Sequence, residues 1–319
     1  MKITLRPAPV LVSLSFLALF SIIAFMTVNA HGRWDFILPF RSVRLAALVL
    51  VGYSVAVSTV LFQTVSNNRI LTPSIMGFDS LYLFIQTVFV FLLGAFVGSS
   101  FPSLLLFFCQ VVVMVAFGCL LYGWMLTRGS HSLHLLLLAG IVFGFLFRGA
   151  SSLMQRMIDP NDFVVLQDRF FASFNVTDTR LLAVSGGIVL LVSLFGLRYS
   201  HFYDVLALGR ETATSLGVNY RRTVTVVLVI ITILVSVSTA LVGPITFLGL
   251  IVANLAYHLA RTFRHRVILP VAVLLSVIFL VGGQMILEHF FAFNTALSII
   301  IEFIGGLFFI GLLVKGGSQ

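Results

Sequence analysis

Long apolar runs separated by short polar segments make up most of this chain. Ten of the runs have about the 20 residues that a helix needs to cross the hydrocarbon core of a bilayer. They lie near 8–29, 44–65, 77–98, 102–127, 133–157, 181–198, 223–242, 245–262, 268–288 and 295–314. The pattern therefore predicts about ten transmembrane helices that form one domain over residues 1–319.

The composition supports the prediction of a membrane protein. Hydrophobic residues make up 60% of the chain and charged residues 9%, whereas about 25% of the residues of a soluble domain are charged. We therefore expect an all-α polytopic membrane protein in contact with lipid. The net charge is +9, but the basic residues are scattered at the ends of apolar runs, so nucleic acid is not an expected partner.

The basic residues also predict an orientation. Lys2 and Arg6 precede the first run as in a secretory signal peptide, but that run is long enough to span a membrane, so we expect a retained helix. If the N-terminus lies inside, twelve Lys and Arg residues fall at inner helix ends and seven on the outer side. This bias follows the positive-inside rule and predicts that both termini are cytoplasmic.

One polar stretch, 204–222, interrupts the apolar runs and is predicted to face the cytoplasm. Gly209 and Gly217 bracket a short predicted helix with its body at 210–216, and Glu211 lies in its first turn, where a carboxylate suits the helix dipole. The segment also has a small apolar side, formed by Leu206, Leu208, Ala213 and Leu216. It is either an ordinary helical loop or a docking helix on which another protein acts.

Two further stretches break the helical pattern at membrane depth. One runs from Asn68 through Pro73 to Gly77 and follows the amide of Gln63; the other contains Gly243, Pro244, Phe247 and Gly249. Irregular backbone at this depth is tolerated where it is buried in protein or lines a cavity. We therefore expect these residues to form helix breaks or to line a pathway, and a break in each half of the chain hints at a duplicated architecture.

The sequence contains no recognisable catalytic, nucleotide-binding or metal-binding motif. The only lysines are Lys2 and Lys315, so no GxxxxGK[ST] phosphate-binding loop exists, and the histidines and cysteines have no metal-ligand spacing. We expect no cofactor and no metal on this chain, and if a nucleotide such as ATP with Mg²⁺ drives the protein, another chain must bind it. Two charges fall inside predicted spans: Glu302 and Arg148 could pair, or Glu302 could line a pathway.

The longest outer segment, 158–180, contains four aspartates and four phenylalanines. It is predicted to be either a helix at the membrane interface with its aromatic face in lipid or a solvated loop.

Four motifs resemble the ferric-siderophore and cobalamin permeases, which are the membrane subunits of type II ABC importers. Arg41-Ser-Val-Arg44 is similar to the family's R-x-P-R, and Gln63 with 68–77 is similar to its Q-x-x-x-x-N-x-L-x-x-P-x-x-L-G. The stretch 208–219 resembles the segment that meets the ATPase, and 243–250 resembles G-P-I-x-F-x-G-L. The match runs over nearly the whole chain.

The resemblance implies a function and partners. It implies import of a ferric siderophore, of catecholate type, across a bacterial inner membrane, with two copies of an ABC ATPase at the coupling segment. It also implies a periplasmic or surface siderophore-binding protein that docks at Arg41 and Arg44. An ion-gradient-driven secondary transporter or channel is the alternative function, and it would favour several membrane-embedded acids, of which Glu302 is the clearest.

The chain also departs from the family pattern. Where the usual permease has P-H-x-x-R, this chain has Ala253, Asn254 and Tyr257, and Gly282 and Ile286 stand near the places of a customary aspartate and arginine, with Glu288 and His289 beyond. The Ala-Asn-x-x-Tyr form is similar to siderophore permeases that work beside a different permease chain. The resemblance therefore implies a heterodimer with a sister permease subunit.

Overall fold

The structure is a computed structural model that describes residues 7–28, 34–94, 102–127, 133–175, 178–291 and 295–316. All regular elements of this part of the chain are helices. In order they are α1 (Pro7–Thr27), α2 (Trp34–Ser66), the 3₁₀ helix η1 (Pro73–Met76), α3 (Phe78–Leu93), α5 (Ser103–Thr127), α6 (Leu133–Gln155), α7 (Pro160–Asp168), α8 (Thr179–Arg198), α9 (Ser200–Leu206), α10 (Arg210–Ser215), α11 (Tyr220–Val242), α12 (Leu248–Ala260), α13 (His265–His289) and α14 (Leu297–Gly316).

The ten predicted spans correspond to ten apolar helices among the described residues. Seven are long enough to cross a membrane, and the apolar parts of α3, α12 and α14 are shorter within the part of the chain that the structure describes. The all-α fold class is therefore confirmed. One boundary differs clearly: α2 begins at Trp34 rather than near residue 44, so Arg41 and Arg44 lie inside a helix of 33 residues.

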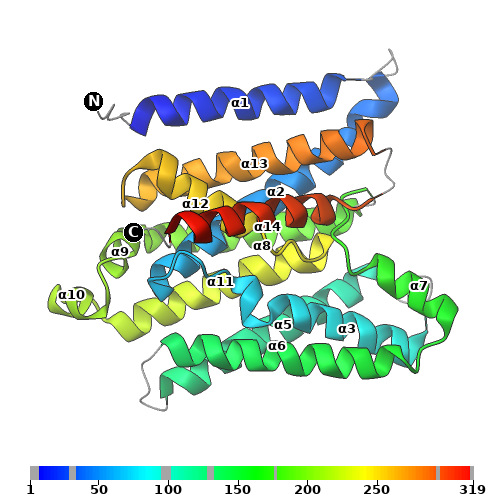
Figure 1. Cartoon of the computed structure of the whole chain (residues 1–319), viewed down its shortest axis with the longest axis horizontal. Coiled ribbons are helices and arrows are strands. Elements are labelled where there is room, and N and C mark those ends of the chain that lie inside the picture. The colour runs from blue at the N-terminus through cyan, green and yellow to red at the C-terminus, as the bar shows by residue number, and fades with distance from the viewer. Residues whose placement is uncertain are drawn as a thin grey trace.

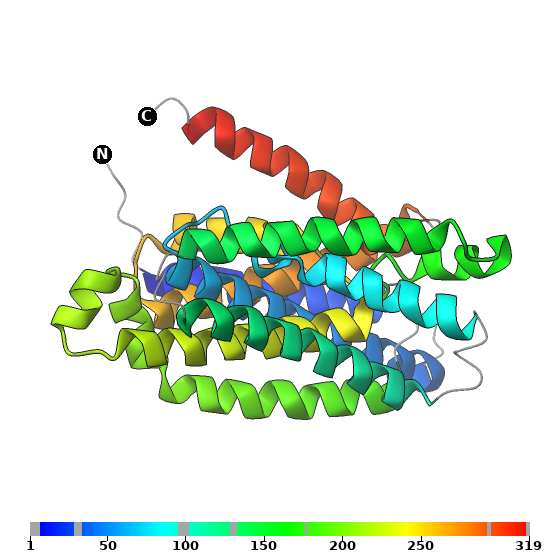
Figure 2. The ribbon, with the colours of Figure 1, turned by 90° about the horizontal axis from the view of Figure 1, so that it is seen from below.

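The helices form a bundle with distinct ends (Figure 1). The short helices α9 and α10 lie at one end, which we call the α10 end, and α7 lies at the other, which we call the α7 end. Helix α1 starts and α14 finishes toward the α10 end (Figures 1 and 2). Figure 2 also shows α14 projecting away from the rest of the bundle.

The centre of the bundle is formed by α2, α11 and α13. Two thirds of the most apolar stretch of α2 and of α11 is buried, against 17% for α6 and α8. The buried faces carry small hydroxyl residues, including Ser54, Ser58, Thr232 and Ser276. Small residues let membrane helices approach closely, and hydroxyls such as those of Ser54 and Thr232 are satisfied by donating to the carbonyl four residues earlier.

The segment after α7 folds back into the bundle. Of the two alternatives for residues 158–180, a helix is present over Pro160–Asp168, where the side chain of Asp159 caps the N-terminus. The expected aromatic face in lipid is wrong for Phe174, because this ring is only 1% exposed and packs in the core. The backbone N–H of Ser173 donates to Val242 O at 2.9 Å, and that of Ala172 donates to Ser298 Oγ at 3.2 Å. These bonds fasten the segment to the end of α11 and the start of α14.

Candidate functional site

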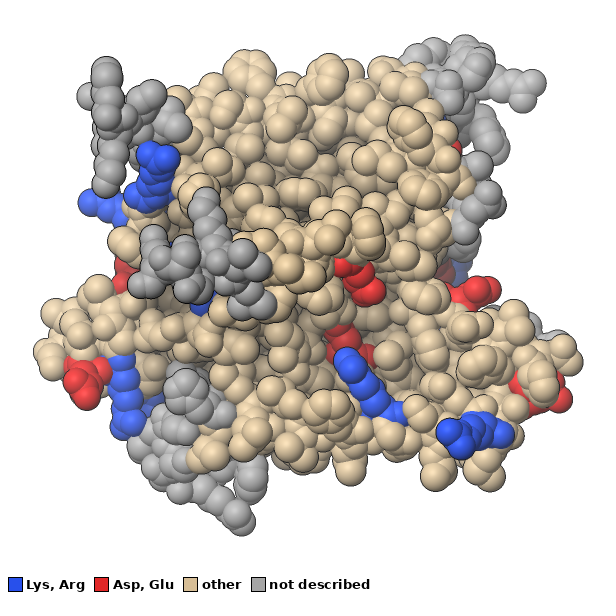
Figure 3. Space-filling model, viewed as in Figure 1, with Lys and Arg blue, Asp and Glu red and all other residues tan. Residues whose placement is uncertain are grey.

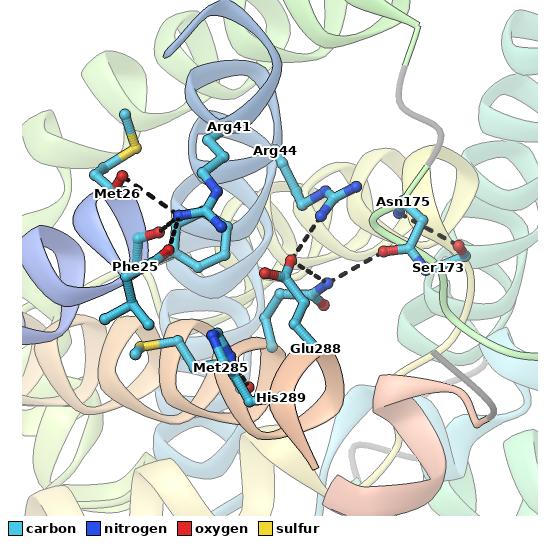
Figure 4. Close-up of polar contacts among 11 residues, drawn as sticks. Phe25, Met26, Arg41, Arg44, Ser173, Asn175, Met285, Glu288 and His289 are labelled. Atoms are coloured by element: carbon cyan, nitrogen blue, oxygen red, sulfur yellow. Dashed lines mark hydrogen bonds and ion pairs between the residues drawn. The ribbon is translucent and has the colours of Figure 1, made fainter. Parts of the chain in front are cut away.

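Arg41, near the start of α2, caps the end of another helix. Its Nη1 atom donates to the carbonyl oxygens of Phe25 at 2.7 Å, Met26 at 3.3 Å and Val28 at 2.7 Å (Figure 4). The last carbonyls of a helix lack intrahelical donors, and a cation near them is favourable for the helix dipole. Arg41 therefore fixes α1 to α2 at the α7 end.

Arg44, one turn further along α2, forms an ion pair with Glu288 on α13. The Nη1 and Oε1 atoms are 2.6 Å apart, and the two side chains are 9% and 8% exposed. The amide of Gln284 donates to Glu288 Oε1 at 3.3 Å and to Asn175 Oδ1 at 3.1 Å (Figure 4). Three segments that are distant in the sequence are thus joined by one buried polar network.

The docking role predicted for Arg41 and Arg44 remains a prediction. Both guanidinium groups have partners within this chain, and the Arg44 side chain is nearly buried. A carboxylate from another protein would have to displace these partners. The motif predicted the position of the two arginines but not the pairing of Arg44 with Glu288.

An open cavity of about 760 Å³ lies at the α7 end. Its walls come from α3, the segment after α7, the ends of α11 and α13, and the start of α14. Its polar lining includes Tyr82, Arg169, Ser173, Asn175, Gln284 and Thr295. The backbone bonds of Ser173 and Ala172 described above hold one wall in place, because this wall has no regular secondary structure of its own.

The two predicted helix breaks meet inside the bundle. The first contains η1 and Gly77, which has φ +87, and the second begins at Gly243, with φ +101. Both glycines occupy a backbone region that side chains rarely adopt. A Cβ on Gly77 would lie 2.9 Å from Gly140 O. The hydroxyl of Thr246 in the second break donates to Asp79 Oδ2, just beyond the first, at 2.8 Å.

A small cavity lies between residues of the two breaks. Its volume is about 20 Å³, which is room for roughly one water molecule. It is lined by Ser58, Thr59, Pro73, Ser74, Gly243, Thr246 and Gly249, among others. Phe247 lies on the other side of this break, where its Cβ packs close to Gly305 of α14. The buried position of Pro244 agrees with a break enclosed by protein.

Gly249 is the tightest contact in this region, and Gly249→Ala is expected to destabilise the protein by about 1–3 kcal/mol. A Cβ at this position would clash with the Thr59 hydroxyl of α2. Gly282→Ala is the matched control, because its Cβ would meet nothing within 4 Å. The measurement is thermal unfolding of the purified protein in detergent. Adding Thr59→Ala should recover part of the loss, and equal stability of both glycine variants would contradict the close approach.

The amide side chains of the first break form hydrogen bonds with backbone groups and do not line an open space. Gln63 is 2% exposed and its Nε2 donates to Arg69 O at 2.6 Å, while Asn68 Oδ1 accepts from the Ile70 N–H at 2.9 Å. Asn254 Nδ2 donates to Arg69 O as well, at 3.1 Å, and the Tyr257 ring stacks 4.8 Å from the Arg69 guanidinium carbon. Asn254 and Tyr257, which depart from the family motif, therefore hold the loop that contains Arg69 in place.

The polar stretch at the α10 end contains two helices rather than one. The helix predicted over 210–216 is confirmed as α10 (Arg210–Ser215), whereas Leu206, which was placed on its apolar side, ends the separate helix α9. Leu206 and Ala213 are buried and hold the segment to the bundle, whereas Leu208 and Leu216 are 59% and 61% exposed. Glu211 is exposed in the first turn of α10, as expected.

Glycines shape both ends of α10. Gly209 has φ +90 and Gly217 has φ +82. The N–H of Gly217 donates to Thr214 O at 2.9 Å and that of Val218 to Ala213 O at 3.1 Å. This pair of bonds is the Schellman motif, which requires a left-handed residue after the helix. Helix α10 is therefore a short, exposed helix with a defined backbone conformation at each end.

A charged contact fastens α9 to the start of α13. Asp204 Oδ1 accepts from the backbone N–H of His265 at 2.8 Å and lies 2.7 Å from its Nδ1 atom. The other ring nitrogen, Nε2, is 2.7 Å from the Thr64 hydroxyl at the end of α2. The contact therefore joins α9, α13 and α2 immediately beside α10.

The same contact controls the ionisation of Asp204. Partial burial raises the pKa of this carboxyl, but hydrogen bonds from the His265 backbone and ring outweigh it, and the pKa ends below its usual value. Because the folded-state pKa is lowered, the stabilisation is present above the ordinary aspartate value of about 3.9 and is lost as the pH falls through the lowered pKa. The carboxylate is therefore ionised throughout the neutral range.

The two membrane-depth charges do not pair with each other. Arg148 Nε donates to the Ser80 hydroxyl at 3.0 Å, and its guanidinium is close enough to Asp79 to interact electrostatically. Glu302 is half-buried and has Asp79 as its electrostatic neighbour. Asp79, which the sequence did not single out, is thus the residue that links the two. Its position in the first turn of an apolar helix was the signal available.

Comparison with known proteins agrees with the motifs. Residues 8–315 match the FecCD transport family. The chain is 49% identical to the petrobactin import system permease protein YclO of Bacillus subtilis, with 89% of this chain and 90% of that protein covered. It is 38% identical to the petrobactin import system permease protein FatC of Bacillus anthracis, with coverages of 86% and 78%.

A solved metal-chelate type ABC transporter in an inward-facing conformation has the same fold, with a TM-score of 0.85 at 23% identity, and the alignment covers 97% of this chain and 99% of that chain. The family match spans nearly all of the helices described above, including both helix breaks and the α9–α10 segment. The chain therefore belongs to the FecCD transport family, as an iron–siderophore permease of the ABC transporter type.

Proposed function

We propose that this chain forms half of the pathway of an ATP-driven importer that moves a ferric siderophore of catecholate type from a binding protein into the cytoplasm. A different permease chain forms the other half, and two copies of an ABC ATPase bind on the cytoplasmic side. The α10 end faces the cytoplasm of a bacterial cell, with both termini on that side, and the chain lies in the inner membrane. ATP and Mg²⁺ are bound by the ATPase, and this chain carries no cofactor.

The observation that carries the proposal is the α9–α10 segment. It lies at the end of the bundle (Figures 1 and 2), it exposes Leu208 and Leu216, and it is fastened to α13 and α2 through Asp204. An exposed apolar side on a well-supported short helix is suited to a groove on a partner protein. Relatives that import petrobactin and enterobactin by name support the substrate class.

The function is tested by reconstituting the chain in liposomes with its sister permease, the ATPase and the binding protein. Uptake of ⁵⁵Fe-labelled siderophore should require ATP and should stop with vanadate. Dissipating the proton and sodium gradients should leave uptake unchanged. Uptake that continues without the ATPase, or that follows an ion gradient, would instead support a secondary transporter.

The C-cap of α10 provides a sharper test of the coupling role. Gly217→Val is expected to lower the siderophore imported per ATP hydrolysed by about tenfold, because a β-branched residue is strained at φ +82 and the Schellman cap would be lost. Gly217→Asn is the matched control, since asparagine tolerates the left-handed region. No side-chain clash complicates the comparison, because nothing lies within 4 Å of a Cβ at Gly217. Equal coupling in both variants would contradict the role of α10.

At the opposite end, docking of the binding protein at Arg41 and Arg44 remains part of the proposal. The contacts described above make Arg41 the more available of the two, because its side chain is only partly buried. A crosslink from the binding protein to this end of α2 would support it.

A further inference from the structure

Charges of both signs come together at membrane depth on one face of the molecule. Figure 3 shows acidic and basic side chains close to one another in the middle of a face that is otherwise largely uncharged, between α14 and α6. The described residues that form this group are Asp79 of α3, Arg148 of α6 and Glu302 of α14, which we call the central charge cluster. Charges at this depth are costly and face protein or a water-filled space.

Two carboxylates and one guanidinium leave this cluster with a formal charge of −1, and its acceptors are incompletely used. Asp79 is 6% exposed; Thr246 donates to its Oδ2, and the Ser74 hydroxyl is close enough to interact with the carboxylate, but Oδ1 has no hydrogen bond of good geometry among the described residues. Glu302 has no hydrogen bond or ion pair within that same part of the chain, and its electrostatic neighbour is the like charge of Asp79. A buried acceptor without a donor costs free energy. The single guanidinium of Arg148 therefore leaves one carboxylate of the cluster without a compensating positive charge.

The cavity at the α7 end lies one helix turn away from these carboxylates. Tyr82 of α3 and Ile299 of α14 line it. Asp79 and Glu302 lie three residues from them on the same helices, hence on the same helix faces. Asp79 is on the side toward the helix break, and Glu302 is one turn further along α14. The two carboxylates are therefore the nearest acidic groups beyond the cavity wall on α3 and α14.

We infer that the central charge cluster is a subsite for a protonated amine of the transported iron chelate, with Asp79 and Glu302 as acceptors. Arg148 adds the complementary half, because its terminal amino groups have no hydrogen-bond partners among the described residues and remain available to the anionic oxygens of the same chelate. The favoured cargo is therefore a ferric chelate that carries ammonium groups beside its anionic iron-binding oxygens. This inference rests on the proposed function.

The test compares two ferric catecholate chelates that differ in one group, a free primary amine or the same amine acetylated. Their ATP-driven uptake is measured in liposomes with the complete transporter. Glu302→Gln is expected to lower the ratio of amine to acetylated uptake about tenfold relative to the unmodified protein, because a charge-assisted hydrogen bond is replaced by a neutral one. Any preference of the binding protein cancels in this double ratio.

Two variants control the experiment. Glu302→Asp keeps a carboxylate and should keep most of the preference, and Phe303→Gln places the same amide on the neighbouring residue, which is 70% exposed, and should leave the ratio unchanged. An unchanged ratio in Glu302→Gln with continuing uptake would overturn the inference and leave the proposed function standing. Loss of the sister permease from the purified complex would assign Glu302 to a subunit contact instead. No uptake of either chelate by the unmodified complex would overturn the proposed function itself.

Discussion

Replacing Glu288 by leucine is expected to lower the free energy of unfolding by about 3–5 kcal/mol, which is the usual consequence of removing one member of a buried ion pair. The Arg44 guanidinium would remain in a site where its side chain is 9% exposed, with the 2.6 Å carboxylate contact removed. The Gln284 amide would also lose one of its two acceptors. Unfolding of the purified permease by titration with a denaturing detergent provides the measurement.

A double variant separates the ion pair from simple loss of packing. Arg44→Met with Glu288→Leu removes both charges and is expected to be more stable than Glu288→Leu alone, because no buried charge remains. His289→Leu is the control, since this exposed neighbour contacts only the Met285 carbonyl in Figure 4. Additive losses in the double variant would show that the 2.6 Å contact is not a coupled pair.

Asp204→Asn is expected to uncouple the transporter, with about a tenfold fall in siderophore imported per ATP hydrolysed. The asparagine keeps the shape but removes the charge that holds the His265 ring and backbone, and hydrogen bonds to charged groups contribute about 1.5–3 kcal/mol when buried. The Asp204 side chain is 43% exposed, so the lower part of this range applies. ATP hydrolysis itself should continue, because the exposed part of α10 is unchanged.

Two variants show whether this effect belongs to the contact. Thr64→Val removes the hydroxyl on the other side of the His265 ring and should uncouple in the same direction. His201→Ala changes an exposed residue of the same helix α9 and should leave the ratio of uptake to hydrolysis unchanged. If Asp204→Asn lowered hydrolysis and uptake equally, the contact would be needed for assembly rather than for coupling.

Much of the fold could be predicted from the sequence because its signals are local. Apolar runs of spanning length placed ten helices, and glycines placed the two breaks and the ends of α10. The separate helix α9 was not predicted, and Leu206, which was assigned to the apolar side of the α10 segment, ends it.

The candidate sites could be predicted only in part, because their chemistry depends on partners that are far apart in the chain. Arg44 and Glu288 are separated by 244 positions, and no periodicity relates two such residues. Phe174 looked like an interfacial aromatic, yet the backbone bond from Ser173 to Val242 draws its segment into the core. Asp79 is one carboxyl in an apolar run, and its neighbours Thr246 and Glu302 become visible only once the breaks are folded together.

Helix α13 has a consequence for the thermodynamics of transport. Its 25 residues extend about 37 Å, and it is fastened at its first residue to Asp204 and near its last residue to Arg44. Pro270 lies inside α13, but the helix is held at both ends, so a change of tilt at one end acts on the contacts at the other. Under the proposed function, ligand affinity at the α7 end and partner affinity at the α10 end are therefore linked quantities. If binding of the ATPase changes the affinity for ligand at the α7 end by some factor, bound ligand must change the affinity for the ATPase at the α10 end by the same factor.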